Sequence, residues 1–171
     1  NPELSNREFS TAALVAEHLN ALGMEVHTEI AHTGVVGILQ GEHSGPIIAL
    51  RADMDALPVT ERTDVPFAST ATGEYRGEEV GVMHACGHDL HVAMLMGAAE
   101  YLASVKDEIQ GNVMFIFQPA EEGAPAGEEG GAELMLREGL FEDVKPDAVF
   151  GIHVWSAGNT GQIGYRKGPL M

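Results

Sequence analysis

The chain has 171 residues, 44% of them hydrophobic, which is enough for one domain with a buried core and excludes a disordered or collagen-like chain. Its 26 Asp and Glu residues against 9 Lys and Arg give a net charge of -17, which repels nucleic acid and anionic lipid surfaces. We therefore predict no nucleic-acid partner and no membrane association. The single cysteine cannot form an internal disulfide, so we expect a cytoplasmic protein, with targeting left open because the chain starts at Asn1.

The first predicted element is a helix. Residues 5–8 (SNRE) have the form of a capping box, and apolar residues then recur at helical spacing as far as Leu22, before Gly23. Residues 24–30 and 34–40 are rich in β-forming residues and are separated by a short polar break. They predict a β-hairpin.

The next segment is a continuous apolar run over 46–50, which is typical of a strand buried on both faces. It is followed at once by Asp53 and Asp55. Residues 60–79 are rich in glycine, threonine and acids with little periodicity, and they predict a long surface excursion.

The rest of the chain alternates helices and strands. We predict a helix over 89–105, a strand over 112–117, a flexible loop over 123–131, a short helix over 132–137, a strand over 148–152 and a final strand over 162–166. Such alternation is typical of crossover units. We therefore expect an α/β fold of three layers, with a mixed, largely parallel sheet flanked by helices.

The segment 83–89 (MHACGHD) contains the only cysteine of the chain, Cys86, with His84 and His88 on either side. A thiolate and a neutral imidazole are ligands that Zn²⁺ prefers, and the start of a helix favours the thiolate. The segment therefore predicts a metal-binding loop. The spacing alone also fits a buried small cysteine beside a surface histidine.

Potential ligands also follow each of the predicted buried strands. In open α/β sheets the binding crevice lies beyond the carboxyl ends of the strands, so these side chains are expected at one rim. They are Asp53, Asp55, Glu121, Glu122 and His153. Each has an ordinary alternative: a turn or cap for the aspartates, solvated charge for the glutamates and a hydrogen-bonded structural role for the histidine.

Four segments resemble one family of enzymes. They are 51–58 (RADMDALP), 83–89 (MHACGHD), 117–123 (FQPAEEG) and 151–155 (GIHVW). In this order they are similar to the metal-dependent amidohydrolases that include hippurate hydrolases, N-acyl-amino-acid amidohydrolases and auxin-conjugate hydrolases, which are relatives of aminoacylase and carboxypeptidase G. The resemblance implies a zinc-peptidase-like fold and hydrolysis of the amide bond of N-acyl amino acids.

The resemblance also implies the roles of individual residues. It makes Cys86, His88, Glu122 and His153 the metal ligands and Glu121 the general base. The implied cofactor is one or two divalent ions, Zn or Mn, with Ni and Co as further candidates. A metal ion acidifies water and polarises the amide carbonyl, so a carboxylate can take the proton and pass it to the departing amine.

Other polar residues in or near these segments receive no ligand role from the resemblance. Asp53 and Asp55 fall where related peptidases carry His-x-Asp, so Asp53 is not assigned as a ligand, and Asp55 is expected to orient one. His84 and His91 are not usual ligands in the family. They are left as candidates to orient the ligands, with a hydrogen-bonded structural role as the expected alternative.

Whole members of this family resemble a catalytic domain interrupted by a smaller lid or dimerisation domain. After that insertion the catalytic fold resumes and supplies one more histidine ligand. We therefore expect residues 1–171 to be the N-terminal portion of the catalytic domain, incomplete and inactive alone. The whole protein is expected to be a homodimer or homotetramer.

Two other functions fit the same residues. One is a cysteine hydrolase in which Cys86 is the nucleophile and His88 or His153 the base. The other is a non-catalytic metal-binding or interaction domain that has kept the scaffold. Chelators and thiol reagents separate the first from a metal hydrolase, and the absence of amide cleavage with metal bound would identify the second.

Overall fold

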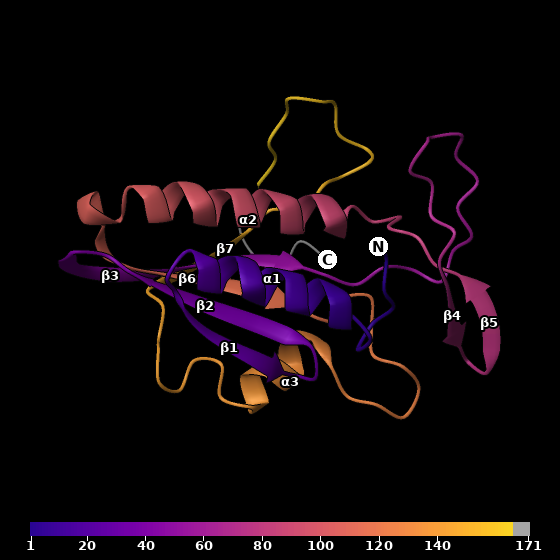
Figure 1. The fold of residues 1–171 in the computed structure, drawn as a ribbon, viewed down its shortest axis with the longest axis horizontal. Helices are drawn as coiled ribbons and strands as arrows, with labels where there is room; N and C mark the ends of the chain where they lie inside the picture. Colours follow the sequence, from indigo (N-terminus) through magenta and orange to yellow (C-terminus); the bar gives the residue numbers. More distant parts are fainter. Residues whose placement is uncertain (166–171) are drawn as a thin grey trace.

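A five-stranded sheet in the order β1-β2-β6-β3-β7 forms the centre of the computed structural model, which describes residues 1–165 (Figure 1). Its strands are β1 (Glu25–Ile30), β2 (Gly34–Gln40), β3 (His43–Asp53), β6 (Gln110–Gln118) and β7 (Ala148–Gly151). The strand β3 pairs in parallel with both β6 and β7. The strand β2 pairs antiparallel with β1 and β6, so the sheet is mixed, and the predicted β1–β2 hairpin is confirmed.

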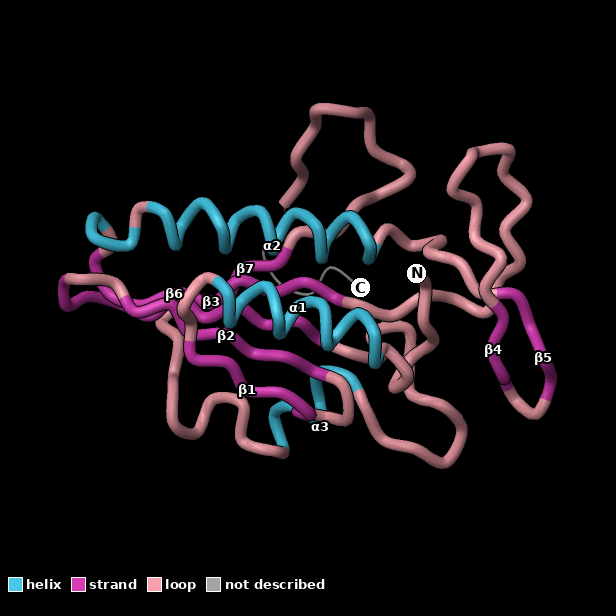
Figure 2. Tube along the Cα trace, viewed as in Figure 1, coloured by secondary structure: helices cyan, strands magenta, loops and turns pink. Residues whose placement is uncertain are grey.

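Helices cover both faces of this sheet. The helices α1 (Phe9–Ala21) and α2 (His88–Ser104) lie on one face, and the short α3 (Gly131–Arg137) lies on the other (Figures 1 and 2). A single turn of 3-10 helix, η1 (Lys106–Glu108), connects α2 to β6. The predicted three-layer α/β architecture is confirmed.

The alternation of side chains along β6 builds the core on both faces of the sheet. Phe115 and Phe117 belong to a buried cluster with residues of α1 and α2, whereas Met114 and Ile116 belong to a second cluster with Met135 of α3. Successive side chains of a strand point to opposite faces, so a continuous apolar run suits a strand that is covered on both sides. Each such side chain contributes about 1.5–3 kcal/mol of hydrophobic stabilisation when fully buried.

The predicted capping box is wrong. Neither Ser5 nor Glu8 caps α1 through its side chain, although the helix begins where the pattern placed it. The cap comes from Glu3, whose carboxylate accepts hydrogen bonds from the backbone N–H groups of Ser10 at 2.9 Å and Thr11 at 2.8 Å. The polar side chains of the expected box make tertiary hydrogen bonds instead.

The predicted surface excursion over 60–79 contains an element that the sequence analysis did not predict. The strands β4 (Thr72–Tyr75) and β5 (Glu78–Gly81) form a small antiparallel hairpin beside the main sheet. Arg76 and Gly77 form its turn, with φ angles of 56° and 82°. The predicted final strand over 162–166 is wrong for residues 162–165, which lie outside any strand, and Arg166 lies outside the described residues.

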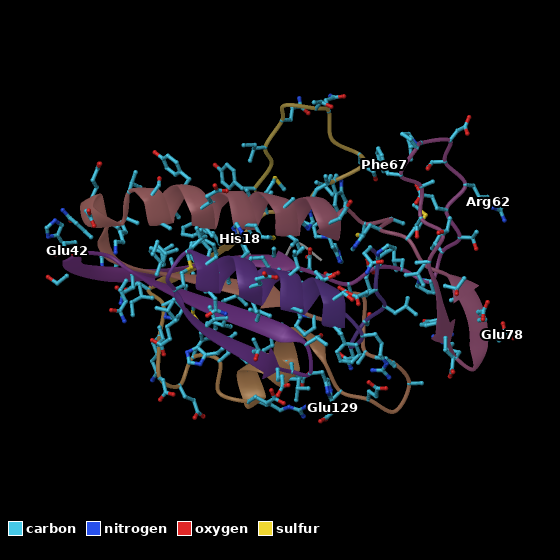
Figure 3. All side chains as sticks on the ribbon, viewed as in Figure 1. His18, Glu42, Arg62, Phe67, Glu78 and Glu129 are labelled. Carbon is cyan, nitrogen blue, oxygen red and sulfur yellow. The ribbon has the colours of Figure 1, made fainter. Side chains whose placement is uncertain are left out.

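Several acidic side chains lie on the outside of the molecule. Glu42, Glu78 and Glu129 are exposed and project from well-separated parts of the chain (Figure 3). Over residues 1–165, none of the helices combines the length and the apolar composition needed to cross a bilayer.

Candidate metal centre

Imidazole, thiol and carboxylate side chains converge at the carboxyl edge of the parallel strands. The strands β3, β6 and β7 end here, and α2 begins beside them. Two overlapping groups each place their ligand atoms within 4.8 Å of one another: Cys86, His88 and Glu122, and Asp53, His88, His91 and His153. Cys86 Sγ also lies 3.8 Å from His153 Nε2. The structure thus brings together the residues predicted as ligands, whose ligand role stays a prediction.

His88 is the centre of this cluster. It is the first residue of α2 and is fully buried, and its Nδ1–H donates a hydrogen bond to the backbone carbonyl of Asp55 at 2.8 Å. The other ring nitrogen, Nε2, has no hydrogen-bond partner among residues 1–165. It faces carboxylate oxygens of Glu121 at 3.5 Å, Asp53 at 3.7 Å and Glu122 at 3.9 Å. A buried lone pair surrounded by carboxylates is an arrangement that a cation satisfies.

The electrostatics of His88 also favour positive charge at this place. Burial lowers the pKa of His88, but the hydrogen bond to Asp55 and the negative charges of Asp53 and Asp55 outweigh it. The pKa therefore lies above the ordinary value for histidine. The same carboxylates that stabilise a proton on Nε2 would also stabilise a metal ion bound there.

Gly87 allows the cysteine and the histidine to stand side by side. Its φ angle of 84° is in the left-handed region, which residues with a Cβ rarely adopt. A Cβ at this position would also lie 2.4 Å from Val154 Cγ2. Glycine therefore lets the chain turn between Cys86 and His88 without strain, and this turn begins α2.

Asp55 fixes the segment that carries the two glutamates. Its Oδ1 and Oδ2 accept hydrogen bonds at 3.0 Å from the backbone N–H groups of Glu121 and Glu122, and Oδ2 also accepts one from Ser5 Oγ at 2.7 Å. Burial raises the pKa of Asp55, but the hydrogen bonds from His88, Ser5 and these two N–H groups lower it by more. The pKa therefore lies below the ordinary value for aspartate. Asp55 thus orients His88 and both glutamates.

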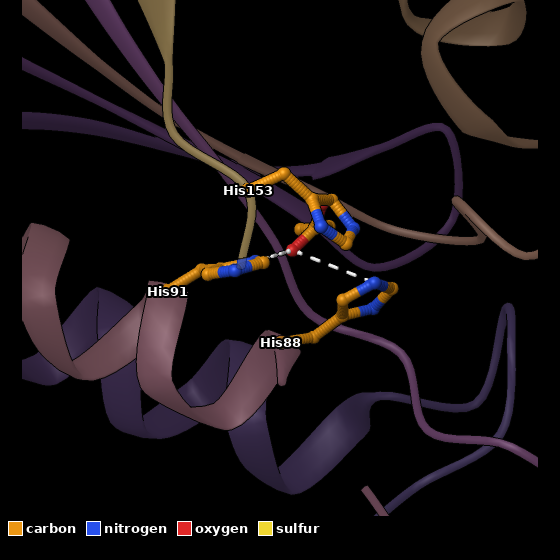
Figure 4. Close-up of side chains that lie close together, drawn as sticks. His88, His91 and His153 are labelled. Atoms are coloured by element: carbon orange, nitrogen blue, oxygen red, sulfur yellow. Dashed lines mark hydrogen bonds and ion pairs between the residues drawn. The ribbon is translucent and has the colours of Figure 1, made fainter. Parts of the chain in front are cut away.

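Asp53 and His91 form a second support. His91 Nδ1–H donates to Asp53 Oδ1 at 2.6 Å, and His91 Nε2 accepts a hydrogen bond from the backbone N–H of Val154 at 3.0 Å. Both nitrogens of His91 therefore have hydrogen-bond partners. The other oxygen of Asp53, Oδ2, accepts a hydrogen bond from Arg51 Nη1 at 2.5 Å. Figure 4 shows the rings of His88 and His91 on α2 facing that of His153.

Sequence reasoning left the role of His91 open, although one signal was present. His91 stands three residues after His88, a spacing that places two side chains on the same face of a helix. The other uncertain histidine, His84, has a buried Nδ1 atom without a hydrogen-bond partner in the described part of the chain. The expectation of hydrogen-bonded structural histidines therefore describes His91 and does not describe this atom of His84.

The expected stabilisation of the Cys86 thiolate by a helix N-terminus is wrong for the metal-free chain. Burial, together with the hydrogen bond to Glu122 and the charges of Glu122, Glu121 and Asp53, raises the pKa of Cys86 to about 12. Burial of the sulfur and the nearby carboxylates both disfavour the thiolate, although the start of α2 is beside it. A thiolate at neutral pH requires a cation beside it.

Comparisons with known proteins agree with this site. Residues 49–168 match the family described as Peptidase family M20/M25/M40. The chain is 51% identical over its whole length to thermostable carboxypeptidase 2 of Saccharolobus solfataricus and 46% identical to hippurate hydrolase of Campylobacter jejuni, covering 40% and 41% of these proteins. It therefore spans about two fifths of the curated relatives that it matches.

A solved structure has the same fold. The crystal structure of the Bacillus subtilis YXEP protein, titled a dinuclear metal-binding peptidase from the M20 family, superposes with a TM-score of 0.83 at 40% identity. The match covers 99% of this chain and 44% of that one. The family match, which includes most of the chain and all the clustered side chains, shows that the chain belongs to peptidase family M20/M25/M40.

Proposed function

We propose that the cluster binds one or two divalent metal ions through Cys86, His88, Glu122 and His153. In the whole protein this site hydrolyses the amide bond of N-acyl amino acids. The observation that carries the proposal is the buried Nε2 atom of His88, which faces three carboxylates and has no hydrogen-bond partner within residues 1–165. The names of the relatives, a carboxypeptidase and a hippurate hydrolase, support the reaction class.

The donor set fits a borderline metal ion. Sulfur and imidazole nitrogen suit Zn²⁺, and carboxylate oxygens suit Mn²⁺, so these two ions are our first choices, with Ni²⁺ and Co²⁺ as further candidates. The lone pair of His153 Nε2 faces this set because its Nδ1–H donates to the carbonyl of Val154 at 2.7 Å. His88 belongs to both groups of potential ligands and is the residue around which either one ion or two would be held.

The position of Glu121 supports its assignment as the general base. Its carboxylate lies 3.5 Å from His88 Nε2, yet 21% of the side chain is exposed, so it reaches both the cluster and the solvent. A bound divalent ion supplies Lewis acidity, which polarises the amide carbonyl and acidifies water. Glu121 takes the proton of the attacking water and delivers it to the departing amine.

The cysteine hydrolase is disfavoured by the surroundings of the thiol. A nucleophilic cysteine needs a lowered pKa, whereas that of Cys86 is raised to about 12. A non-catalytic metal-binding domain would also bind the ion, so only a measurement of amide hydrolysis distinguishes it from an enzyme.

The test measures hydrolysis of hippurate and other N-acyl amino acids by the whole protein. We expect EDTA to abolish turnover, Zn²⁺ or Mn²⁺ to restore it, and iodoacetamide to have no effect on the metal-loaded enzyme. Turnover that survives EDTA and is lost with iodoacetamide would identify the cysteine hydrolase. Bound metal without turnover across the substrates would identify a binding domain.

A further inference from the structure

We propose that Glu8 is a positioning residue for the turn that carries Glu121 and Glu122. Glu8 precedes α1, and its side chain is fully buried. Its Oε1 accepts a hydrogen bond at 2.9 Å from the backbone N–H of Ala120, a residue 112 positions later in the chain. The opposite oxygen, Oε2, accepts one at 2.5 Å from Thr33 Oγ1, which fixes the carboxylate from the other side.

The turn held by Glu8 has an unfavourable backbone conformation. Ala120 has a φ angle of 48°, a left-handed conformation that is unfavourable for a residue with a Cβ because the Cβ approaches the following carbonyl oxygen. The turn closes with a hydrogen bond of 3.3 Å from the N–H of Gly123 to the carbonyl of Ala120. Such a conformation persists only where the surroundings hold it.

Two buried carboxylates hold three consecutive N–H groups of this turn. Glu8 accepts from Ala120, and Asp55 accepts from Glu121 and Glu122. Asp55 lies between the turn and His88. Glu8 precedes α1, and its side chain bonds to Ala120 and Thr33, neither of which is a proposed metal ligand. The direction in which both glutamate side chains leave the backbone therefore depends on an acid outside the cluster.

This inference deepens the proposed function, on which it rests for the roles of Glu121 and Glu122. A positioning role for Glu8 differs from a purely structural role in anchoring α1. A structural residue affects the stability of the fold alone. A positioning residue also changes the order of the turn and the affinity of the metal site in the folded protein.

The test compares variants that keep or shorten the reach of this carboxylate. Glu8→Gln keeps the length and an oxygen for the N–H of Ala120, whereas Glu8→Asp keeps the charge and is one methylene too short. The matched control is Glu3→Asp, because Glu3 also accepts backbone N–H groups at the start of α1 but does not touch the turn. The measurements are amide hydrogen exchange of residues 120–122 and calorimetric titration of the full chain with Zn²⁺.

For Glu8→Asp we expect exchange at residues 120–122 to become about tenfold faster and Zn²⁺ binding about tenfold weaker. Glu8→Gln and Glu3→Asp should behave like the parent in both measurements. Parent-like exchange and affinity in folded Glu8→Asp, or equal changes in Glu3→Asp, would overturn the proposal. If Glu8→Asp does not fold, Thr33→Val, which removes the second hydrogen bond to Glu8, takes its place with the same two outcomes.

The exchange measurement needs neither metal nor substrate. If hippurate is not hydrolysed by the whole protein, the proposed function fails while the exchange result still decides the role of Glu8. If hydrolysis is found and exchange in Glu8→Asp is unchanged, the positioning role alone fails.

Discussion

Replacing His88 with alanine should abolish the stabilisation that a metal ion gives to this protein. In the metal-free chain, the unpartnered Nε2 atom of His88 costs about 1–3 kcal/mol, because it is buried without a hydrogen bond in the described part of the chain. An ion at about 100 times its Kd adds about 2.7 kcal/mol to the free energy of unfolding. For a domain of this size that corresponds to a rise in Tm of about 5–10 °C.

The assay is differential scanning calorimetry of the parent chain and the variant, each with EDTA and with Zn²⁺. The Tm of the parent should rise with Zn²⁺ and return with EDTA, whereas His88→Ala should have the same Tm in both. His43→Ala is the control, since His43 is exposed at the start of β3. An undiminished rise of Tm in His88→Ala would refute the assignment of His88 as the central ligand.

Three further predictions test other parts of the site and the fold. In the whole enzyme Glu121→Gln should retain its metal by elemental analysis and lose about 10²–10⁴-fold in kcat, and loss of the metal would mean that the roles of the glutamates are reversed. Gly87→Ala should lower the free energy of unfolding in urea by about 1–3 kcal/mol, because of its positive φ and the approach to Val154, and an unchanged midpoint would contradict this. Glu3→Gln should cost about 1 kcal/mol at pH 7. Burial raises the pKa of Glu3, but hydrogen bonds from Ser10 and Thr11 lower it below 4.5, so this difference should shrink as the pH falls below 4.5 and should not grow.

The layers of the fold were predictable because apolar periodicity is a local property. The strand β6 is apolar at every position from 113 to 117, and this pattern is typical of a short strand covered on both faces. The failures concern side chains whose partners are distant in sequence. Glu8 has the spacing of a capping box, but the N–H of Ala120 and the hydroxyl of Thr33 compete for its carboxylate, and no local pattern contains those partners.

The hairpin β4–β5 was missed for a different reason. Its strands carry glycine and charged residues, so their alternation is weak, and only the Arg76-Gly77 pair signals a two-residue turn. The candidate site was easier to predict than its supports. Ligand types at the ends of buried strands are visible in sequence, whereas the hydrogen bonds of Asp55 and His91 depend on which loops meet in space.

The parallel pairing of β3 with β6 and β7 determines when a metal ion can be captured during folding. Each parallel neighbour is reached by a long crossover, and closing such loops is slow compared with forming a hairpin. The donors from these strand ends meet only after both crossovers have closed. We therefore expect the ion to act late, slowing the unfolding of the assembled chain while leaving the rate of refolding unchanged.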